Sequence, residues 1–232
     1  MKRVFITGAN RGIGLEFVRQ LLERGDQVFA GVRNPDAATS LRRLSAQHHD
    51  QVIPVRIDVT DTGSIKAARS AVSIHTNALD WLINNAGILQ RGERLGEFDA
   101  AMFNRTFQVN VTGPALVTQA FVDLLGAGEQ PLLVNMTSQL GSLARKSSAS
   151  THSYSASKAA LNMLTRTLTY ELKPMGITTV MMHPGWVQTD MGGDNANLTA
   201  SEAVAGMLNV LDRLTPADTG SFLQYDGQRL PW

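Results

Sequence analysis

The chain has 232 residues, enough for one large α/β domain or two small ones, and its 43% hydrophobic and 18% charged residues are typical of a globular protein with a large core. The formal net charge of +1 gives no indication of nucleic acid or an acidic membrane as a partner. With no cysteine, the chain cannot form disulfides, thiolate nucleophiles or cysteine-ligated metal sites, and we expect no metal.

The amino-terminal apolar run is too short for a targeting segment. Val4–Ile6 is followed at once by Thr7 and Gly8, far too soon for the apolar core of a signal peptide. No run approaches the roughly 18 apolar residues of a membrane-spanning helix. We therefore expect a cytoplasmic protein that has neither a membrane nor a nucleic acid as partner.

Short β-branched or aliphatic runs predict seven strands, at Arg3–Thr7, Gln27–Val32, Val52–Asp58, Leu79–Asn84, Leu132–Met136, Thr178–His183 and Ser221–Leu223. Between them, apolar residues at helical spacing predict helices at about 12–25, 37–47, 62–76, 100–126, 153–173 and 200–213. This alternation predicts a mostly parallel seven-stranded sheet with helices on both faces. Right-handed crossovers then predict a single doubly wound Rossmann-type α/β domain over residues 1–232.

The turn after the first strand is rich in glycine. Gly8, Gly12 and Gly14 fall between this strand and the next predicted helix, where glycines permit a tight turn and let a pyrophosphate approach backbone N–H groups. The spacing Gly-x-x-x-Gly-x-Gly differs from the general dinucleotide fingerprint Gly-x-Gly-x-x-Gly. The alternative is a glycine-rich turn without a ligand.

An arginine follows the second predicted strand, where a dinucleotide site that selects NAD carries an acidic residue. A guanidinium at Arg33 binds a 2′-phosphate in bidentate fashion, and Arg11 in the glycine-rich turn offers a second cation. These residues favour NADP(H) over NAD(H). The alternative is that Arg33 is only a solvated strand end.

Tyr154 and Lys158 lie four residues apart near the start of a predicted helix and therefore share one of its faces. A phenol titrates near pH ~10, and a nearby ammonium favours the phenolate and lowers its pKa. The pair suits acid/base chemistry on an alcohol or a carbonyl. Taken alone, the same spacing is also common on ordinary surface helices.

Motifs along the whole chain occur in a family-specific order. They are the glycine-rich turn, Asp58-Val59, Asn84-Asn85-Ala86-Gly87, Asn110, Ser138, Tyr154-x-x-x-Lys158 and the run Pro184 to Met191. In this the chain resembles the short-chain dehydrogenase/reductase superfamily. The loop Thr7 to Leu15 and the ending Tyr225 to Trp232 are similar to those of one branch, the C-factor and sniffer-like carbonyl reductases.

The resemblance implies a catalytic set and a cofactor site. In the catalytic set Tyr154 transfers the proton, Lys158 holds the nicotinamide ribose and lowers the phenol pKa, Ser138 binds the substrate oxygen, and Asn110 fixes a water linked to Lys158. The implied cofactor-binding residues are completed by the two arginines described above. Together they are Gly8, Asn10, Arg11, Gly12, Ile13, Gly14, Arg33, Asp58, Val59, Asn84, Ala86, Gly87, Tyr154, Lys158, Pro184, Gly185, Val187 and Thr189.

Single residues of this set keep plainer alternatives. Ser138 can cap a strand or loop, Asn110 can be a core residue bonded to a backbone carbonyl, and Asp58 can form an Asx turn that closes its strand. Two loops, at about 139–153 and 190–198, are expected to shape the substrate pocket. The first makes the separation of Ser138 and Tyr154 a few residues longer than is usual in the superfamily.

The sequence therefore predicts an NADPH-dependent carbonyl reductase or alcohol dehydrogenase, an enzyme that acts on a small-molecule carbonyl or alcohol. The alternatives are an NAD-dependent dehydrogenase and a nucleotide-binding signalling protein with vestigial catalysis. A homodimer or homotetramer is possible, since similar proteins pair their long helices. Apolar residues at 100–126 and 153–173, such as Leu116, Phe121, Leu161, Leu164 and Leu168, fit this pairing or packing on the chain's own sheet.

Overall fold

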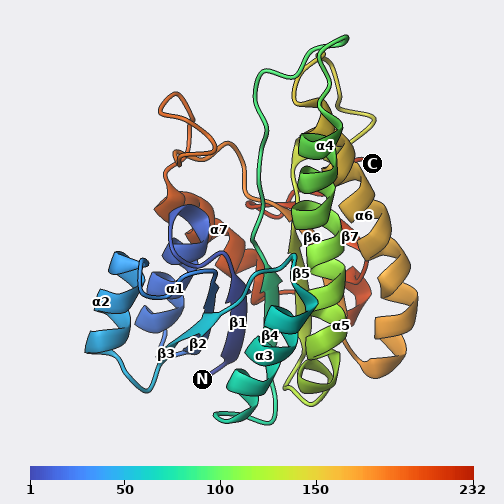
Figure 1. The fold of residues 1–232 in the computed structure, drawn as a ribbon. Helices are drawn as coiled ribbons and strands as arrows, with labels where there is room; N and C mark the ends of the chain where they lie inside the picture. Colours follow the sequence, from blue (N-terminus) through green and yellow to red (C-terminus); the bar gives the residue numbers. More distant parts are fainter.

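A seven-stranded sheet runs through the centre of the computed structural model, which describes residues 1–232 (Figure 1). Its strands are β1 (Arg3–Thr7), β2 (Gln27–Val32), β3 (Val52–Arg56), β4 (Trp81–Asn84), β5 (Leu132–Met136), β6 (Thr178–His183) and β7 (Ser221–Gln224). They lie in the order β3-β2-β1-β4-β5-β6-β7, and every pair of neighbours is parallel. The predicted Rossmann-type sheet is confirmed, and it is parallel throughout.

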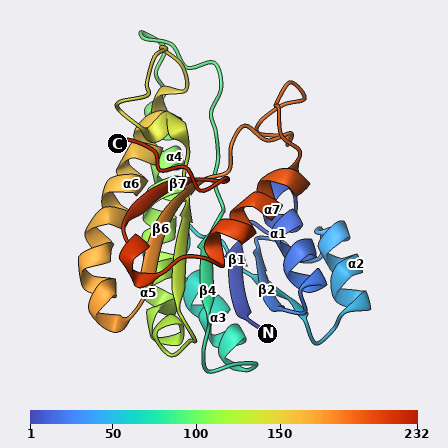
Figure 2. The ribbon, with the colours of Figure 1, turned by 180° about the vertical axis from the view of Figure 1, so that it is seen from behind.

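Helices cover both faces of the sheet. The α-helices are α1 (Gly12–Glu23), α2 (Thr39–Gln47), α3 (Thr62–Ser73), α4 (Ala100–Phe107), α5 (Gly113–Gly126), α6 (His152–Leu172) and α7 (Ala200–Leu211). Shorter helical elements are η1 (Gln108–Thr112), η2 (Gln139–Gly141), η3 (Lys173–Met175) and η4 (Pro216–Asp218). Seen from the two sides, α1, α2 and α7 lie on one face, and α3, α5 and α6 lie on the other (Figures 1 and 2).

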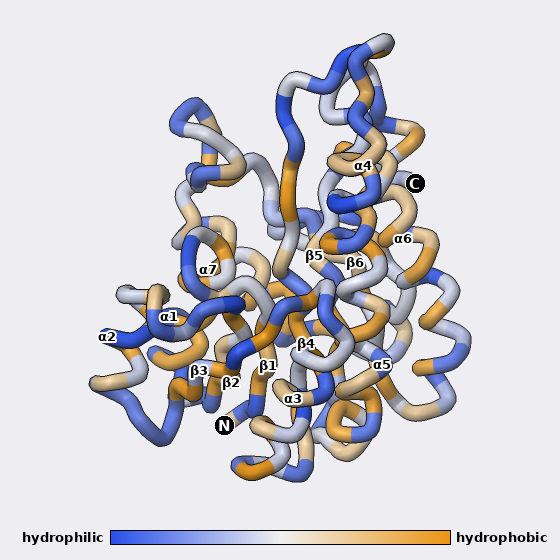
Figure 3. Tube along the Cα trace, viewed as in Figure 1, coloured by the Kyte–Doolittle hydropathy of each residue, from blue (hydrophilic) through white to orange (hydrophobic).

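Alternation along the strands divides the apolar residues between these two layers. Val4 and Ile6 of β1 pack with α1 and α7, whereas Phe5 points to the opposite layer and stacks on Phe121 of α5, 4.3 Å between ring centroids. Figure 3 shows hydrophobic residues concentrated along the strands and polar residues along the outer turns. Both faces of the sheet are therefore buried, as a parallel sheet requires.

The strand order reverses beside β1, which pairs with β2 on one side and β4 on the other. In open α/β sheets a ligand binds outside the carboxyl ends of the strands at such a switch point. The β4–α4 connection (residues 85–99) and the chain before α6 extend beyond this end of the sheet (Figure 1). The fold thus places the functional loops at one edge.

The predicted helix over 100–126 is three elements, because a π-helical turn, η1, separates α4 from α5. Pro114, the second residue of α5, has no N–H to donate to the preceding turn, which favours a local departure from α-helical bonding. Gly113 allows a close approach, since a Cβ there would lie 3.0 Å from the Val59 carbonyl oxygen. The wider turn carries Asn110, which is buried.

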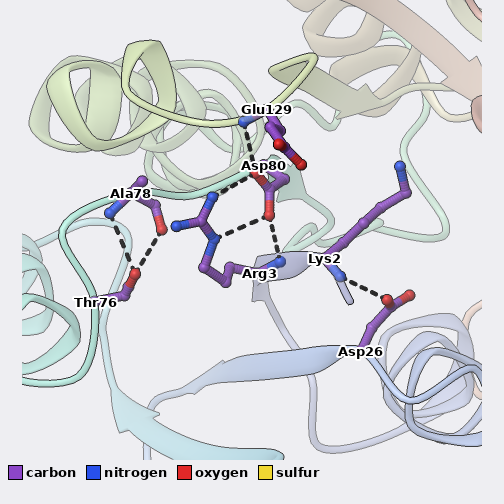
Figure 4. A network of polar contacts seen from close by, with 7 residues as sticks. All are labelled: Lys2, Arg3, Asp26, Thr76, Ala78, Asp80 and Glu129. Carbon is purple, nitrogen blue, oxygen red and sulfur yellow. Dashed lines mark hydrogen bonds and ion pairs between the residues drawn. The ribbon is translucent and has the colours of Figure 1, made fainter.

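The opposite end of the sheet is held by a carboxylate network (Figure 4). Asp80 accepts hydrogen bonds from the Arg3 backbone N–H (2.7 Å), from Arg3 Nε (3.0 Å) and Nη2 (2.8 Å), and from the Glu129 N–H (2.7 Å). Burial raises the pKa of Asp80, but the hydrogen bonds from Arg3 and Glu129 outweigh it, so the net pKa is lowered. Nearby, the Lys2 N–H donates to Asp26 (2.7 Å).

No helix in the structure has both the length and the apolar character that a membrane crossing demands.

Candidate active site

The glycine-rich turn between β1 and α1 is built to approach a ligand. Gly8 and Gly12 have φ values of 70° and 52°, a region that side chains disfavour. A Cβ on Gly14 would overlap the Gly8 carbonyl oxygen, so the turn and helix pack too closely for any other residue. Arg11, at the N-cap of α1, makes no side-chain capping bond. The first N–H groups of α1 are thus left for an external anion.

One cavity of about 840 Å³ extends from this turn along the carboxyl edge of the sheet to α6. Most of the predicted cofactor residues line it. They are Gly8, Asn10, Arg11, Gly12, Ile13, Gly14, Arg33, Asp58, Val59, Ala86, Gly87, Tyr154, Lys158, Pro184 and Thr189. Residues far apart in the sequence are therefore brought to one elongated space, with cationic side chains at one end and Tyr154 with Lys158 at the other.

Three predicted cofactor residues lie behind the cavity wall. Asn84 is buried, and its Nδ2 donates to Asn135 (2.8 Å) and Thr118 (3.1 Å). Val187 is buried in the core beside α7 and pairs with Leu198 through an isolated bridge. Gly185 has a φ of 85° and faces Leu198 and Tyr225 closely enough to exclude a side chain. In this structure they shape the wall, and direct contact with a cofactor stays a prediction.

Tyr154 and Lys158 share one face of the first turns of α6, as predicted from their spacing. The Lys158 Nζ lies 5.7 Å from the centroid of the Tyr154 ring and donates a hydrogen bond to the Met136 carbonyl, 2.7 Å away. Ser138 follows β5, and its hydroxyl accepts from the Leu140 N–H at 3.2 Å. Gly87 lies beside this group, because a Cβ there would be 3.7 Å from Lys158 Nζ.

The pKa values in this group differ from the sequence-based expectation. Burial raises the pKa of Tyr154 to about 12, although its hydrogen bond with Ser138 acts in the opposite direction. Burial also lowers the pKa of Lys158 to about 8. In this structure desolvation of the phenol dominates and the Lys158 ammonium is directed at the Met136 carbonyl, so the expectation that Lys158 lowers the phenol pKa stays a prediction.

Asn110 ties the π-helical turn to two other segments. Its Oδ1 accepts from the Ile88 N–H (2.9 Å), and its Nδ2 donates to the Ile88 carbonyl (2.9 Å) and to Ser157 Oγ (3.0 Å). Asn110 therefore fastens the β4–α4 connection beside α6 and the Tyr154–Lys158 pair. The plainer alternative, a core amide bonded to a backbone carbonyl, describes these contacts, and the predicted water at Asn110 stays a prediction.

The cationic end of the cavity contains an arginine that the sequence-based reasoning missed. Arg105 of α4 lines the cavity and donates to Thr60 Oγ1 at 3.2 Å. Thr60 in turn donates its N–H (2.9 Å) and hydroxyl (2.7 Å) to Asp58 Oδ1, which is the Asx turn considered as an alternative for Asp58. The Thr60 backbone bond is the main cause of a lowered pKa for Asp58, with smaller contributions from Arg105 and Arg33.

Arg33 is exposed at the same end and takes part in none of the structure's ion pairs, whereas Arg11 pairs with Asp190. Other lining residues absent from the prediction are Val32, Asn34, Ala37, Ala38, Ile57, Asn85, Ile88, Val109, Met136, Thr137, Gln188, Asp190 and Met191. Many of them are adjacent in sequence to predicted residues, and this adjacency was the signal that could have found them. For Arg105 the signal was weaker: it precedes Asn110 by five positions on the same predicted helix.

The chain before α6 is held partly by the carboxyl-terminal residues. Ser142 Oγ donates to the Pro231 carbonyl (2.7 Å), and the Ala144 N–H donates to the Trp232 carbonyl (2.9 Å). At the other end of the loop, the Ser153 N–H donates to Glu93 (2.9 Å) in the β4–α4 connection. The loop expected to shape the substrate pocket is therefore tied at both ends, close to Ser138 and Tyr154.

The residues of the cavity fit a dinucleotide. Free N–H groups at the start of α1 and the glycine turn suit a pyrophosphate, and Arg33 and Arg105 suit the phosphorylated end. At the far end lie the phenol of Tyr154 and the ammonium of Lys158, whereas Ser138 is buried and is not part of the cavity lining. The parallel sheet with a nucleotide-type cavity at its switch point, and a Tyr–Lys pair inside it, define the class of nucleotide-dependent α/β oxidoreductases.

Within that class, residues 2–198 match the model of the short chain dehydrogenase family, and the chain belongs to this family. A carbonyl reductase from chicken fatty liver, described as NADPH bound, superposes with a TM-score of 0.95 at 37% identity and covers 100% of this chain and 99% of its own. The carbonyl reductase Sniffer of D. melanogaster gives a TM-score of 0.95 at 30% identity over 100% of both chains.

Among curated relatives, C-signal of Myxococcus xanthus is 44% identical over 162 residues, which are 70% of this chain and 98% of the relative. The predicted superfamily and its C-factor and sniffer-like branch are therefore confirmed.

Proposed function

We propose that this protein is an NADPH-dependent carbonyl reductase that converts a carbonyl compound to an alcohol. The observation that carries the proposal is that Tyr154 and Lys158 line the same cavity as the phosphate-binding glycine turn. Similarity to a carbonyl reductase described as NADPH bound supports both the cofactor and the reaction. The coarser statement, membership of the short-chain dehydrogenase family, does not depend on this proposal.

The cofactor site uses groups that are available in the structure. The N–H groups of Asn10, Gly12 and Ile13 receive the pyrophosphate, with Gly8 and Gly14 permitting the approach. Arg33 binds the 2′-phosphate, and Asp58 with Val59 holds the adenine. Ala86 and Gly87 line the ribose side, and Pro184 with Thr189 orients the carboxamide of the nicotinamide.

When bound, the nicotinamide supplies the hydride that reduces the carbonyl carbon. Tyr154 gives its proton to the oxygen that becomes the alcohol, and its raised pKa keeps the phenol protonated, ready to donate, at neutral pH. Ser138 donates a hydrogen bond to the same oxygen as negative charge develops. Lys158 binds the nicotinamide ribose and stabilises the phenolate left after transfer. Asn110 keeps the surrounding loops in place through its bonds to Ile88 and Ser157. It also fixes a water linked to Lys158.

The test is oxidation of NADPH by the purified chain across aldehydes, ketones and quinones, beside a Tyr154→Phe variant. We expect turnover with at least one class of carbonyl and a loss of about 10²–10⁴-fold in the variant, because the general acid is removed. NADPH binding, followed by its fluorescence, should be nearly unchanged. Turnover retained by Tyr154→Phe contradicts the mechanism.

Two alternatives give different results in the same assay. An NAD-dependent dehydrogenase would bind NADH as tightly as NADPH and turn over alcohols with NAD. A nucleotide-binding signalling protein with vestigial catalysis would bind NADPH and oxidise it with none of the carbonyl compounds. The similarity to C-signal is the observation that keeps the second alternative in view.

We also propose that α6 contributes to a homodimer or homotetramer. Phe121 and Leu161 are buried within the chain's own core, but Met163 and Tyr170 of α6 are 69% and 71% exposed. Seven residues apart, they lie on one side of the helix. Sedimentation velocity of the purified chain, and of a Met163→Glu variant, tests this; a monomer at micromolar concentration would contradict it.

A further inference from the structure

An ion pair joins two segments on the rim of the cavity. Arg11, in the glycine turn, pairs with Asp190, and both residues line the cavity. Their side chains are 69% and 75% exposed. Arg11 also occupies the N-cap position of α1, beside the N–H groups that the proposed function assigns to a pyrophosphate. The Asp190 carboxylate therefore lies beside the N–H groups and the guanidinium that would otherwise bind a phosphate.

Asp190 is presented by a compact turn, residues Thr189–Gly193, which we call the Asp190 turn. The Gly192 N–H donates to Thr189 Oγ1 (3.0 Å) and the Gly193 N–H to the Thr189 carbonyl (2.8 Å). Trp186 Nε1 donates to the Gly192 carbonyl (2.9 Å). These bonds hold the turn together without using the Asp190 carboxylate.

The Asp190 turn lies against the glycine turn and is also bound from the other side of the cavity. A Cβ on Gly12 would be 3.3 Å from Thr189 Cγ2, so the two segments are close neighbours. Arg91, in the β4–α4 connection, donates from Nη2 to the Met191 carbonyl at 2.6 Å. The turn therefore spans two walls of the cavity, and the Arg11–Asp190 pair is its ionic contact on the glycine-turn side.

We propose that Asp190 competes with a phosphate of NADP(H) for Arg11, so that cofactor binding releases the Asp190 turn from the glycine turn. This inference rests on the proposed cofactor. An exposed carboxylate–guanidinium pair contributes little, about 0.2–1 kcal/mol. A phosphate carries more charge and also accepts two parallel hydrogen bonds from a guanidinium, so the exchange of partners favours the cofactor. Asp190 thereby sets cofactor affinity and couples it to the proposed substrate loop.

Asp190→Asn removes the competitor, and Asp194→Asn is the matched control. Asp194 is an exposed carboxylate four residues further on that makes none of the structure's ion pairs or side-chain hydrogen bonds. Equilibrium titration at low ionic strength should show NADPH binding to Asp190→Asn about two- to fivefold more tightly than to wild type, the range of an exposed ion pair. Asp194→Asn should change the affinity much less.

Arg11→Met supplies the second arm. If Asp190 acts through Arg11, Asp190→Asn should tighten NADPH binding no more than Asp194→Asn does once Arg11 is absent. Parallel titration with NADH identifies the phosphate: tightening confined to NADPH assigns the 2′-phosphate, and equal tightening of both cofactors assigns the pyrophosphate. Unchanged NADPH affinity in Asp190→Asn, or equal effects of the two Asn variants, overturns the competition.

Trp186 reports on the Asp190 turn directly. Its emission should change when 2′,5′-ADP or NADPH binds, should be altered already in unliganded Asp190→Asn, and should be missing from the difference signal of Trp186→Phe. No change in Trp186 emission on saturation with NADPH overturns the release of the turn. A wild-type chain that binds no NADPH would instead refute the proposed function, so the two failures are distinguishable.

Discussion

The two ends of the sheet use charged side chains in opposite ways. At the amino end, Asp80 is buried and receives four hydrogen bonds from Arg3 and Glu129. At the carboxyl end, Arg33 has no ion-pair partner, and Arg11 has a solvent-exposed one. A buried and fully bonded carboxylate stabilises the fold, whereas exposed cations with weak partners can take up a ligand. The difference separates the structural end from the binding end.

The largest effect should come from Lys158. Replacing it with Met leaves the Met136 carbonyl without its donor and removes the charge that stabilises a Tyr154 phenolate. We expect turnover to fall by about 10²–10⁴-fold, as for loss of an acid/base group. Steady-state NADPH oxidation measures the loss, and the melting temperature serves as the control. A variant that keeps a tenth of wild-type turnover would show that the ammonium is dispensable.

Asp80→Asn, at the amino end of the sheet, should lower the free energy of unfolding and leave cofactor binding unchanged. The amide cannot accept all four hydrogen bonds, and one N–H group or the guanidinium loses its charged partner, a cost of about 1–3 kcal/mol. Urea unfolding measures this free energy, and NADPH affinity should not change. Altered cofactor affinity at equal foldedness would contradict the separation of the two ends.

The same carboxylate predicts an acid sensitivity. Because the folded-state pKa of Asp80 is lowered, its contribution to stability is present above the unfolded pKa near 3.8 and is lost as the pH falls through the folded value. The wild-type advantage over Asp80→Asn should therefore be constant from pH 7 to 5 and shrink below pH 4. Urea midpoints at these pH values provide the measurement; a constant difference down to pH 2 would contradict it.

Arg33→Gln should change cofactor choice without changing the fold. Loss of a charge-assisted hydrogen bond costs about 1.5–3 kcal/mol, which is at least a tenfold weakening of NADPH binding. NADH, which lacks the 2′-phosphate, should bind as before. Titration of both cofactors against wild type measures the preference, and equal weakening of NADH would show that Arg33 does not recognise the 2′-phosphate.

The smallest effect concerns pH and activity. Burial lowers the pKa of Lys158 to about 8, so the ammonium is mostly charged at pH 7 and mostly neutral at pH 9. Reductive turnover should decline by several-fold across that interval, because the neutral amine no longer stabilises a phenolate. The pH profile of kcat tests this, with Lys158→Arg as the control that stays charged. A profile flat to pH 9 would place the titration elsewhere.

Periodicity and motif spacing were sufficient to predict the sheet and the Tyr154–Lys158 face. Strands β1, β2, β5 and β6 have the predicted bounds because buried parallel strands are continuous apolar runs. β3 ends at Arg56, before the predicted Asp58, since the Asp58 carboxylate accepts the Thr60 N–H in a turn. Such local patterns carry no information on partners distant in sequence.

What could not be predicted depends on long-range contacts. Arg11 and Asp190 are 179 positions apart, and nothing near either residue indicates the pair. The raised pKa of Tyr154 follows from desolvation, whereas the spacing in the sequence indicated only the cation nearest to it. Asn84 belongs to a family motif, yet its side chain bonds Asn135 and so joins β4 to β5. This contact depends on the opposing strand and could not be predicted from the motif.

The π-helical turn at Gln108–Thr112 has a consequence for how this protein can be redesigned. A π-turn accommodates one more residue than an α-turn over the same rise, so removing one residue there would let the backbone close into a continuous α-helix. Everything before the deletion would then rotate by about 100° relative to α5. Shortening by a single codon is thus a more severe perturbation at this point than many side-chain exchanges, although the helix itself would be more regular.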